Sequence, residues 1–232
     1  MRSATSYFNF TLFRKNLSRF WPIWGLYSLI WLVLLPVNLL TDGDYLTLAR
    51  TRLIPLQYLN GTSAALAMAF CFGILCAMAV FSYLYNSRSV GLLHALPMRR
   101  EGLFLTNYLS GLSFMVLPNL AVFFLSLLVE AAFGVVVFSS LFTWLVTTSF
   151  YCLFFYSFAV FCAMFTGNLG ALPVFYGILN FLATILVQLL GTVCRQFLYG
   201  FYNFPSALYA AAEWLTPALN LYRAVVPTYT TD

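Results

Sequence analysis

Long apolar stretches separated by short polar segments dominate the pattern of the chain. A helix needs roughly 20 mostly apolar residues to cross the hydrocarbon core of a bilayer. Five stretches meet this requirement, at residues 21–40, 63–85, 103–128, 141–165 and 169–193. The pattern therefore predicts an all-α integral membrane protein, a polytopic helical bundle whose five spans belong to a single transmembrane domain over residues 1–232.

The segment before the first span has an amphipathic pattern over residues 7–20. Apolar side chains recur at helical spacing, at Phe10, Phe13, Leu17 and Phe20. Polar and basic side chains occupy other positions, namely Asn9, Arg14, Lys15, Asn16 and Arg19. Such a helix suits the membrane interface. We expect an interfacial helix; the alternative is a cytoplasmic extension of the first span.

The segment after the fifth span, residues 194–232, is apolar but interrupted. Its two aromatic-rich pieces, residues 197–202 and 205–215, are too short to span. We expect short helices that dip into the outer interface as a re-entrant hairpin; the alternative is a sixth span. Three prolines within or near spans, Pro36, Pro118 and Pro173, are expected to kink their helices.

Composition excludes a soluble domain. The chain is 62% hydrophobic and 7% charged, whereas about 25% of the residues in a soluble domain are charged. The net charge of +5 lies in short groups between the spans, which sets membrane orientation and gives no patch for nucleic acid. Seven basic residues fall on one predicted side: Arg2, Arg14, Lys15, Arg19, Arg88, Arg99 and Arg100. The other side has four, so the N-terminus is expected in the cytoplasm.

Candidate polar and packing residues lie inside the predicted spans. Glu130 near the outer end of the third span, together with Asn119, Asn180 and Gln188, are candidates for function because polar groups are costly in a membrane. The alternatives are snorkelling for Glu130 and helix–helix hydrogen bonds for the others. A stripe of small residues at a spacing of four comprises Ala65, Ala69, Gly73 and Ala77. It suits either a dimer seam or internal packing.

Catalysis finds no support in the sequence. The only histidine is His94, and the five cysteines contain no Cys-x-x-Cys pair, so we expect no metal site and no cofactor. The only lysine, Lys15, is followed by Asn16, which excludes a P-loop. We therefore expect no enzyme activity and no catalytic residue in this chain.

The segment 86–101 between the second and third spans is basic and contains a short apolar pattern. Ser87–Ala95 could form a helix with Val90, Leu93 and Leu92 on one face, and Pro97 would end it. Such a helix could dock into a groove on a partner protein. The alternative is an ordinary basic cytoplasmic loop.

This segment resembles the first cytoplasmic loop of ABC-2 type transporter permeases, most closely those of Gram-positive bacteria. The resemblance covers Tyr85–Gly111 and rests on a His-x-Leu-Pro-x-x-Arg-Glu pattern, here His94, Leu96, Pro97, Arg100 and Glu101. The order of spans is also similar to that family. Permeases of the family have a sixth span after the outer hairpin, and none follows here. We therefore keep open that the chain is a truncated, inactive permease fragment or one piece of a larger assembly.

The resemblance implies a permease subunit that works with a separate ABC ATPase subunit and with a second permease subunit, identical or different, in the lipid of a bacterial plasma membrane. The partner-coupling residues would be Arg88, Val90, Gly91, Leu93, His94, Leu96, Pro97, Arg99, Arg100 and Glu101. A non-transport membrane scaffold or assembly protein is the alternative function. A secondary transporter would need inverted repeats and mid-membrane charges, which the sequence does not show convincingly.

Overall fold

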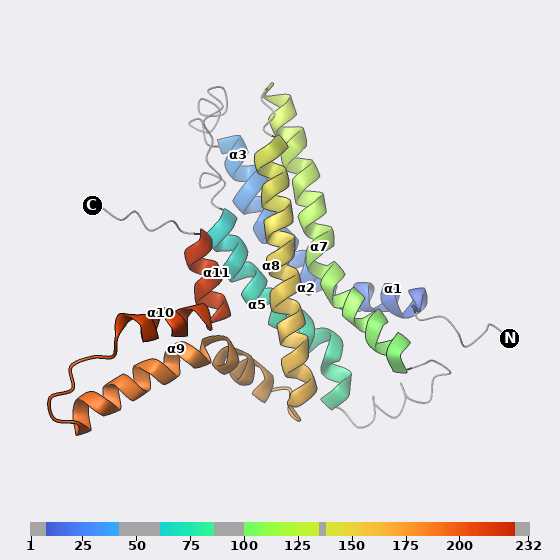
Figure 1. The fold of residues 1–232 in the computed structure, drawn as a ribbon. Coiled ribbons are helices and arrows are strands. Elements are labelled where there is room, and N and C mark those ends of the chain that lie inside the picture. Colours follow the sequence, from blue (N-terminus) through green and yellow to red (C-terminus); the bar gives the residue numbers. More distant parts are fainter. Residues whose placement is uncertain (1–7, 42–60, 86–99, 135–137, 226–232) are drawn as a thin grey trace. The chain divides into compact units, whose positions relative to one another are not determined.

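The computed structural model describes residues 8–41, 61–85, 100–134 and 138–225, without the side chains of 61–63 and 222–225. This part of the chain is all-α (Figure 1). Five of its helical segments are long and apolar enough to cross a membrane: Trp21–Thr41, Ala64–Tyr85, Arg100–Ala132, Phe138–Phe165 and Ala171–Phe197. The predicted all-α polytopic fold with five spans is confirmed.

The chain divides into two compact units, Met1–Leu172 and Pro173–Asp232. Unit 1 contains the first four candidate spans, and unit 2 contains nearly all of the fifth. The single transmembrane domain expected over residues 1–232 stays a prediction.

Unit 1 begins with two helices that meet at Phe20. Helix α1 (Phe10–Arg19) is capped by the Asn9 side chain, which accepts from the backbone N–H groups of Thr11 and Leu12. Helix α2 (Trp21–Leu32) starts with Pro22 in its first turn, where a missing N–H costs little. The span continues through a π-helical turn, η1 (Val33–Val37), into α3 (Asn38–Thr41). Pro36 lies inside that turn. Proline has no backbone N–H to donate, and the π-helical turn accommodates the missing hydrogen bond.

Helices α5 (Gly61–Phe81) and α8 (Phe138–Phe165) pack closely against each other. The small-residue stripe lies in their interface. Ala65, Ala69 and Ala77 are buried, and a Cβ on Gly73 would come within 3.2 Å of the α8 backbone at Phe155 and Tyr156. The stripe therefore contributes to packing inside this unit.

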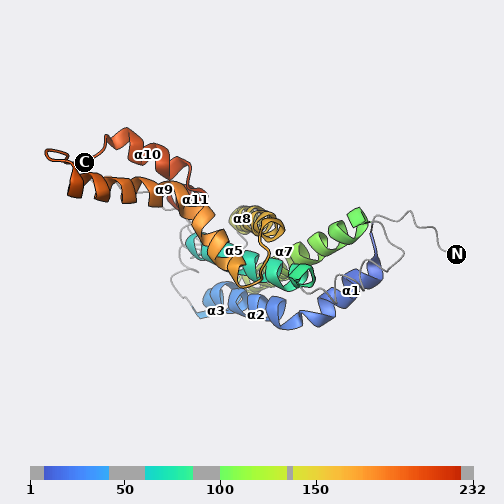
Figure 2. The same ribbon diagram turned by 90° about the horizontal axis from the view of Figure 1, so that it is seen from below.

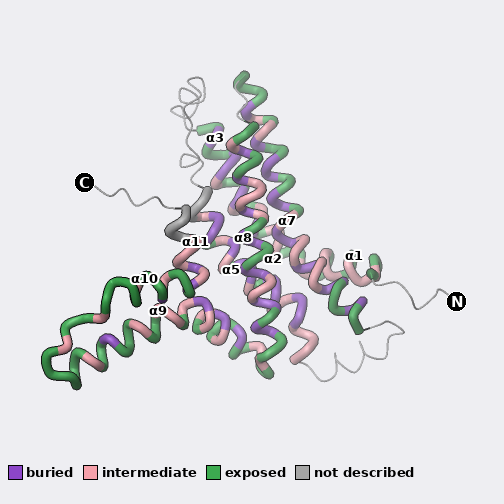
Figure 3. The backbone as a smooth tube through the Cα atoms, viewed as in Figure 1, coloured by how far each residue is buried: buried purple, intermediate pink, exposed green. Residues whose placement is uncertain are grey.

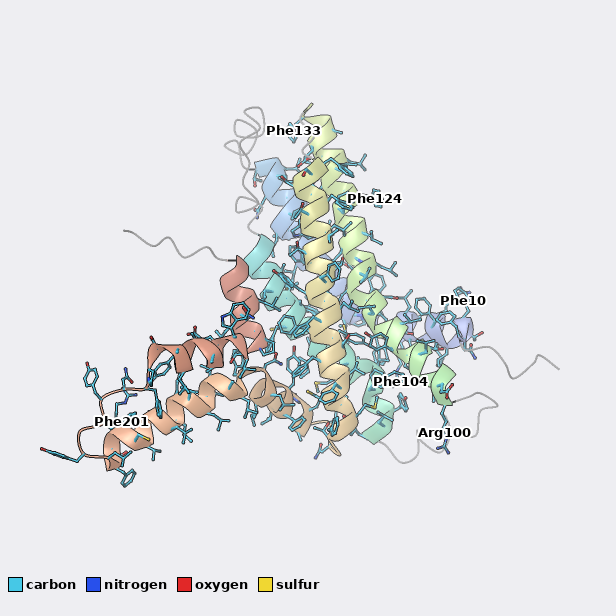
Figure 4. All side chains as sticks on the ribbon, in the orientation of Figure 1. Phe10, Arg100, Phe104, Phe124, Phe133 and Phe201 are labelled. Carbon is cyan, nitrogen blue, oxygen red and sulfur yellow. The ribbon has the colours of Figure 1, made fainter. Side chains whose placement is uncertain are left out.

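Helix α7 (Arg100–Ala132) runs through Pro118 without a break. Its buried residues follow one another at spacings of three and four, and buried and exposed positions alternate along it (Figure 3). The exposed side is apolar, as Phe104 and Phe124 show in Figure 4. A surface of this kind needs lipid to cover it.

Aromatic side chains fill the interior of unit 1. Trp31 of α2 lies edge-on to Trp144 of α8 with ring centroids 4.9 Å apart, and Tyr27 packs against Phe72 at 5.0 Å. Such T-shaped pairs are favourable beyond the area they bury. They join α2, α5 and α8 in one core.

Unit 2 consists of α9 (Ala171–Phe197), α10 (Ser206–Trp214) and α11 (Pro217–Val225). Helix α10 runs back along α9 (Figures 1 and 2), and the hydroxyls of Thr184 and Thr216 are 2.7 Å apart. Pro173 lies in the first turn of α9, where a proline removes no helical hydrogen bond. The kink expected at Pro173 stays a prediction.

The short helices predicted after the fifth span are partly correct. Helix α10 matches the expected helix over 205–215, but residues 198–205 form no helix and include a turn with Gly200 at φ 82°. Helices α10 and α11 have nine residues each and are about 14 Å long. Neither can cross a core of roughly 30 Å, so the alternative of a sixth span finds no support in the described residues.

Candidate functional site

Most of the predicted coupling segment lies outside the described residues. This applies to Arg88, Val90, Gly91, Leu93, His94, Leu96, Pro97 and Arg99. Arg100 and Glu101 are described; they open α7, and both are exposed (Figure 4 labels Arg100). An acidic residue in the first turn is favourable beside the positive end of the helix dipole. With 33 residues, α7 is about 50 Å long, so its first turns can extend beyond the hydrocarbon core.

The chain enters this segment from a tightly anchored turn. The second span ends in a short 3₁₀ helix, η2 (Ser82–Tyr85). The Tyr85 hydroxyl donates to the carbonyl oxygen of Ala163 at 2.8 Å and lies 2.9 Å from the hydroxyl of Thr166. The end of the second span is therefore tied to the same end of α8.

The chain leaves the segment into a helix that is hydrogen-bonded to α1. The Asn16 side chain donates to Asn107 Oδ1 at 2.8 Å and to Ser110 Oγ at 3.4 Å, and the backbone N–H of Asn9 donates to Thr106 Oγ1 at 3.1 Å. Both figures place α1 beside the first turns of α7 (Figures 1 and 2). We call Asn9, Asn16, Thr106, Asn107 and Ser110 the loop-end polar cluster.

The hydroxyls of this cluster can accept because they donate elsewhere. Thr106 donates to the carbonyl of Gly102 and Ser110 to that of Thr106, each at 2.7 Å. Their oxygens then remain available as acceptors for α1. The result is a hydrogen-bonded contact between α1 and the first turns of α7, the helix that follows the predicted coupling segment.

A second polar cluster lies deeper in unit 1 and joins three helices. The Tyr27 hydroxyl of α2 donates to Asn119 Oδ1 of α7 at 2.8 Å and lies 3.4 Å from the Cys152 sulfur of α8. The Asn119 amide also reaches that sulfur, at 3.9 Å. All three residues are buried. Buried polar groups are normally hydrogen-bonded, and this three-helix cluster supplies the partners of Asn119.

The structure does not bring Asn119 and Glu130, the two predicted intramembrane polar residues of unit 1, together. Glu130 is buried in the last turn of α7, 11 residues and about 16 Å along the helix from Asn119. Asn180 and Gln188 belong to unit 2. Asn180 donates to the carbonyl of Tyr176 one turn earlier, whereas Gln188 is exposed.

Sequence reasoning missed several residues of both clusters. On α7, Asn107 and Ser110 follow the same three-and-four spacing as the buried apolar residues, so a helical wheel that marked polar residues on the buried face would have found them. Tyr27 and Cys152 carry no such signal, because tyrosine and cysteine in an apolar span usually only pack.

The two clusters contain uncharged amides, hydroxyls and one thiol. In the parts of the chain that the structure describes, no three His, Cys, Asp or Glu side chains gather in a way that could hold a metal ion. The arrangement can connect helices and transmit their movement. No family model, curated protein or solved structure matches this chain.

Proposed function

We propose that this chain is the transmembrane permease subunit of an ATP-driven ABC-2 type exporter in a bacterial plasma membrane. The observation that carries the proposal is the pattern from His94 to Glu101, which leads directly into α7. In this role, residues 86–101 dock onto a separate ATPase subunit in the cytoplasm. The N-terminus and α1 then face the same side as that ATPase.

The anchoring on both sides of the segment supports this mechanism. Tyr85 ties the entry to α8, and Asn16 ties α1 to the start of α7. Because both ends connect to packed helices, a push on residues 86–101 would move several spans together. Coupling between distant sites needs packed or hydrogen-bonded connections of this kind.

Energy would come from the partner. The only lysine of the chain, Lys15, stands outside any P-loop pattern. ATP hydrolysis would therefore take place in the ATPase subunit, and a second permease subunit, identical or different, would form the other half of the transporter.

The test is co-purification of the tagged full-length chain with the ATPase encoded by a neighbouring gene. Scrambling residues 90–97 should abolish the association, because it removes the apolar face of the docking segment. A scramble of the same length over residues 51–58, on the predicted opposite side of the membrane, is the matched control and should leave the association intact. Survival of the complex after the first scramble would rule out the coupling role. Failure of the unaltered chain to retain any ATPase would favour a membrane scaffold.

A further inference from the structure

An apolar groove of about 220 Å³ lies where α1, α2 and α7 of unit 1 meet. Its lining comprises Leu17 of α1, Trp24 and Ser28 of α2, and Ser113, Leu117, Pro118 and Ala121 of α7. The α7 residues Ser113, Leu117 and Ala121 follow one another at a spacing of four, a row about 12 Å long. The groove therefore runs along α7 and reaches α1 at Leu17.

Local hydrogen bonds hold the walls of the groove in place. The Trp24 indole N–H donates to the carbonyl oxygen of Leu17 at 3.0 Å, which fixes the ring and joins α2 to the last turn of α1. The hydroxyls of Ser28 and Ser113 donate to carbonyls of their own helices, at 2.6 and 2.7 Å. With these donors satisfied, the walls offer mainly carbon atoms to an occupant.

The α1 end of the groove is basic. Arg14, Lys15 and Arg19 are exposed on the helix that contributes Leu17. The sequence from Met1 to Thr41 contains no aspartate or glutamate to oppose them. Arg14 is three positions before Leu17 and lies on the same side of α1, whereas Lys15 and Arg19 are two positions from Leu17 and lie on the other side. An apolar groove with a cation beside its end matches the two parts of a phospholipid, the acyl chain and the anionic headgroup.

We infer that this groove binds an anionic phospholipid, with an acyl chain along Ser113–Ala121 and the phosphate beside the basic residues of α1. A larger groove of unit 1, about 380 Å³ between α7 and α8, is lined by residues of those two helices only. Neither lining contains a basic residue; the first groove differs because it reaches α1, the helix that carries Arg14, Lys15 and Arg19. This inference does not depend on the proposed transport function.

Native mass spectrometry of the full-length chain tests the inference. The protein is taken from vesicles of equal phosphatidylglycerol and phosphatidylethanolamine into mild detergent, and the retained lipids are counted. We expect phosphatidylglycerol to be preferred. Arg14→Gln should lower that preference roughly fivefold, because one basic residue near the surface has about this effect on anionic lipid. Lys15→Gln, on the other side of α1, should lower it less. Arg195→Gln, on α9, is the matched charge control and should leave the preference unchanged.

Filling the groove tests the acyl-chain position. Ala121→Phe should displace the retained phosphatidylglycerol. Ser113→Leu adds a side chain smaller than phenylalanine at the other end of the row and should act in the same direction. Ser149→Phe fills the groove between α7 and α8 and should leave the preference intact. Unchanged retention in both groove variants, unchanged preference in the charge variants, or an equal loss in Arg195→Gln would overturn the inference. The inference would also be overturned if Ala121→Phe disrupted an oligomer without any change in bound lipid.

Discussion

Gly111 of α7 lies so close to Tyr156 of α8 that no side chain fits between them. An added Cβ would overlap the tyrosine hydroxyl and two ring carbons. Tyr156 is fully buried, and among the described residues its hydroxyl has no hydrogen-bond partner. The ring therefore cannot move without disturbing a packed interior, and the absence of a side chain at residue 111 sets how closely α7 approaches α8.

Gly111→Ala is therefore expected to destabilise the protein by about 1–3 kcal/mol, the usual cost of overpacking. Reversible unfolding in mixed detergent micelles measures the change. Gly25→Ala is the matched control, because a Cβ there would meet the Trp21 ring at an ordinary 3.6 Å, so its stability should be unchanged or higher. Adding Tyr156→Phe to Gly111→Ala removes the overlapping hydroxyl and should restore part of the lost stability. If Gly111→Ala costs no stability and Tyr156→Phe restores none, the contact between residues 111 and 156 is not tight.

At the scale of elements, hydrogen bonds join α1 to α7 beside the apolar contact of Phe20 with Phe114. Asn16 and the backbone of Asn9 bond to α7, while the apolar Phe10 is two-thirds exposed. The hydrogen bonds hold α1 against α7 while the Phe10 side chain stays available for lipid; Phe13, Leu17 and Phe20 are half-buried.

A double-mutant cycle of Asn16→Ala and Asn107→Ala should give a coupling energy of about 0.6 kcal/mol, with an upper range near 1.7, as for other hydrogen bonds between membrane helices. The same unfolding assay supplies the four free energies. Thr143 donates only within its own helix in the described structure, so a cycle of Thr143→Ala with Asn107→Ala should give no coupling. A value near zero for the Asn16 cycle would mean that this hydrogen bond does not hold α1.

At the scale of the whole molecule, five spans with the proposed cytoplasmic N-terminus would require alternate connections to face opposite sides. In a background without native cysteines, Phe133→Cys and Tyr199→Cys should react with a membrane-impermeant maleimide in intact cells, because both native side chains are exposed near helix ends. Asn168→Cys should react only after permeabilisation. Phe150→Cys, within the apolar outer face of α8, is the control and should not react in either case. The reverse pattern would place residues 86–99 outside the cell, away from any cytoplasmic ATPase.

Most of the fold could be predicted from the sequence. The five spans agree with the structure to within a few residues at each end, because apolar content over about 20 residues is a local property. The candidate coupling segment also comes from the sequence alone. The structure adds only its flanks, through Tyr85, Arg100 and Glu101.

The partners of the polar residues could not be predicted. Tyr27 and Asn119 are 92 positions apart, and Asn16 and Asn107 are 91 apart. Their contacts depend on which helices pack together and how each is rotated, which hydropathy does not encode. The same holds for Gly73: a stripe of small residues indicates a close neighbour but does not identify it.

The sequence by itself determined that this chain crosses a membrane, roughly where each crossing begins and ends, and that it carries no P-loop. Only the tertiary structure decided that Gly73 of the small-residue stripe faces α8, that α1 is hydrogen-bonded to α7, and that an apolar groove reaches α1 at Leu17. The physical reason is the distance along the sequence over which each property is set. Transfer into lipid depends on the composition of one segment, whereas hydrogen bonds, close packing and grooves require side chains from several helices to meet in space.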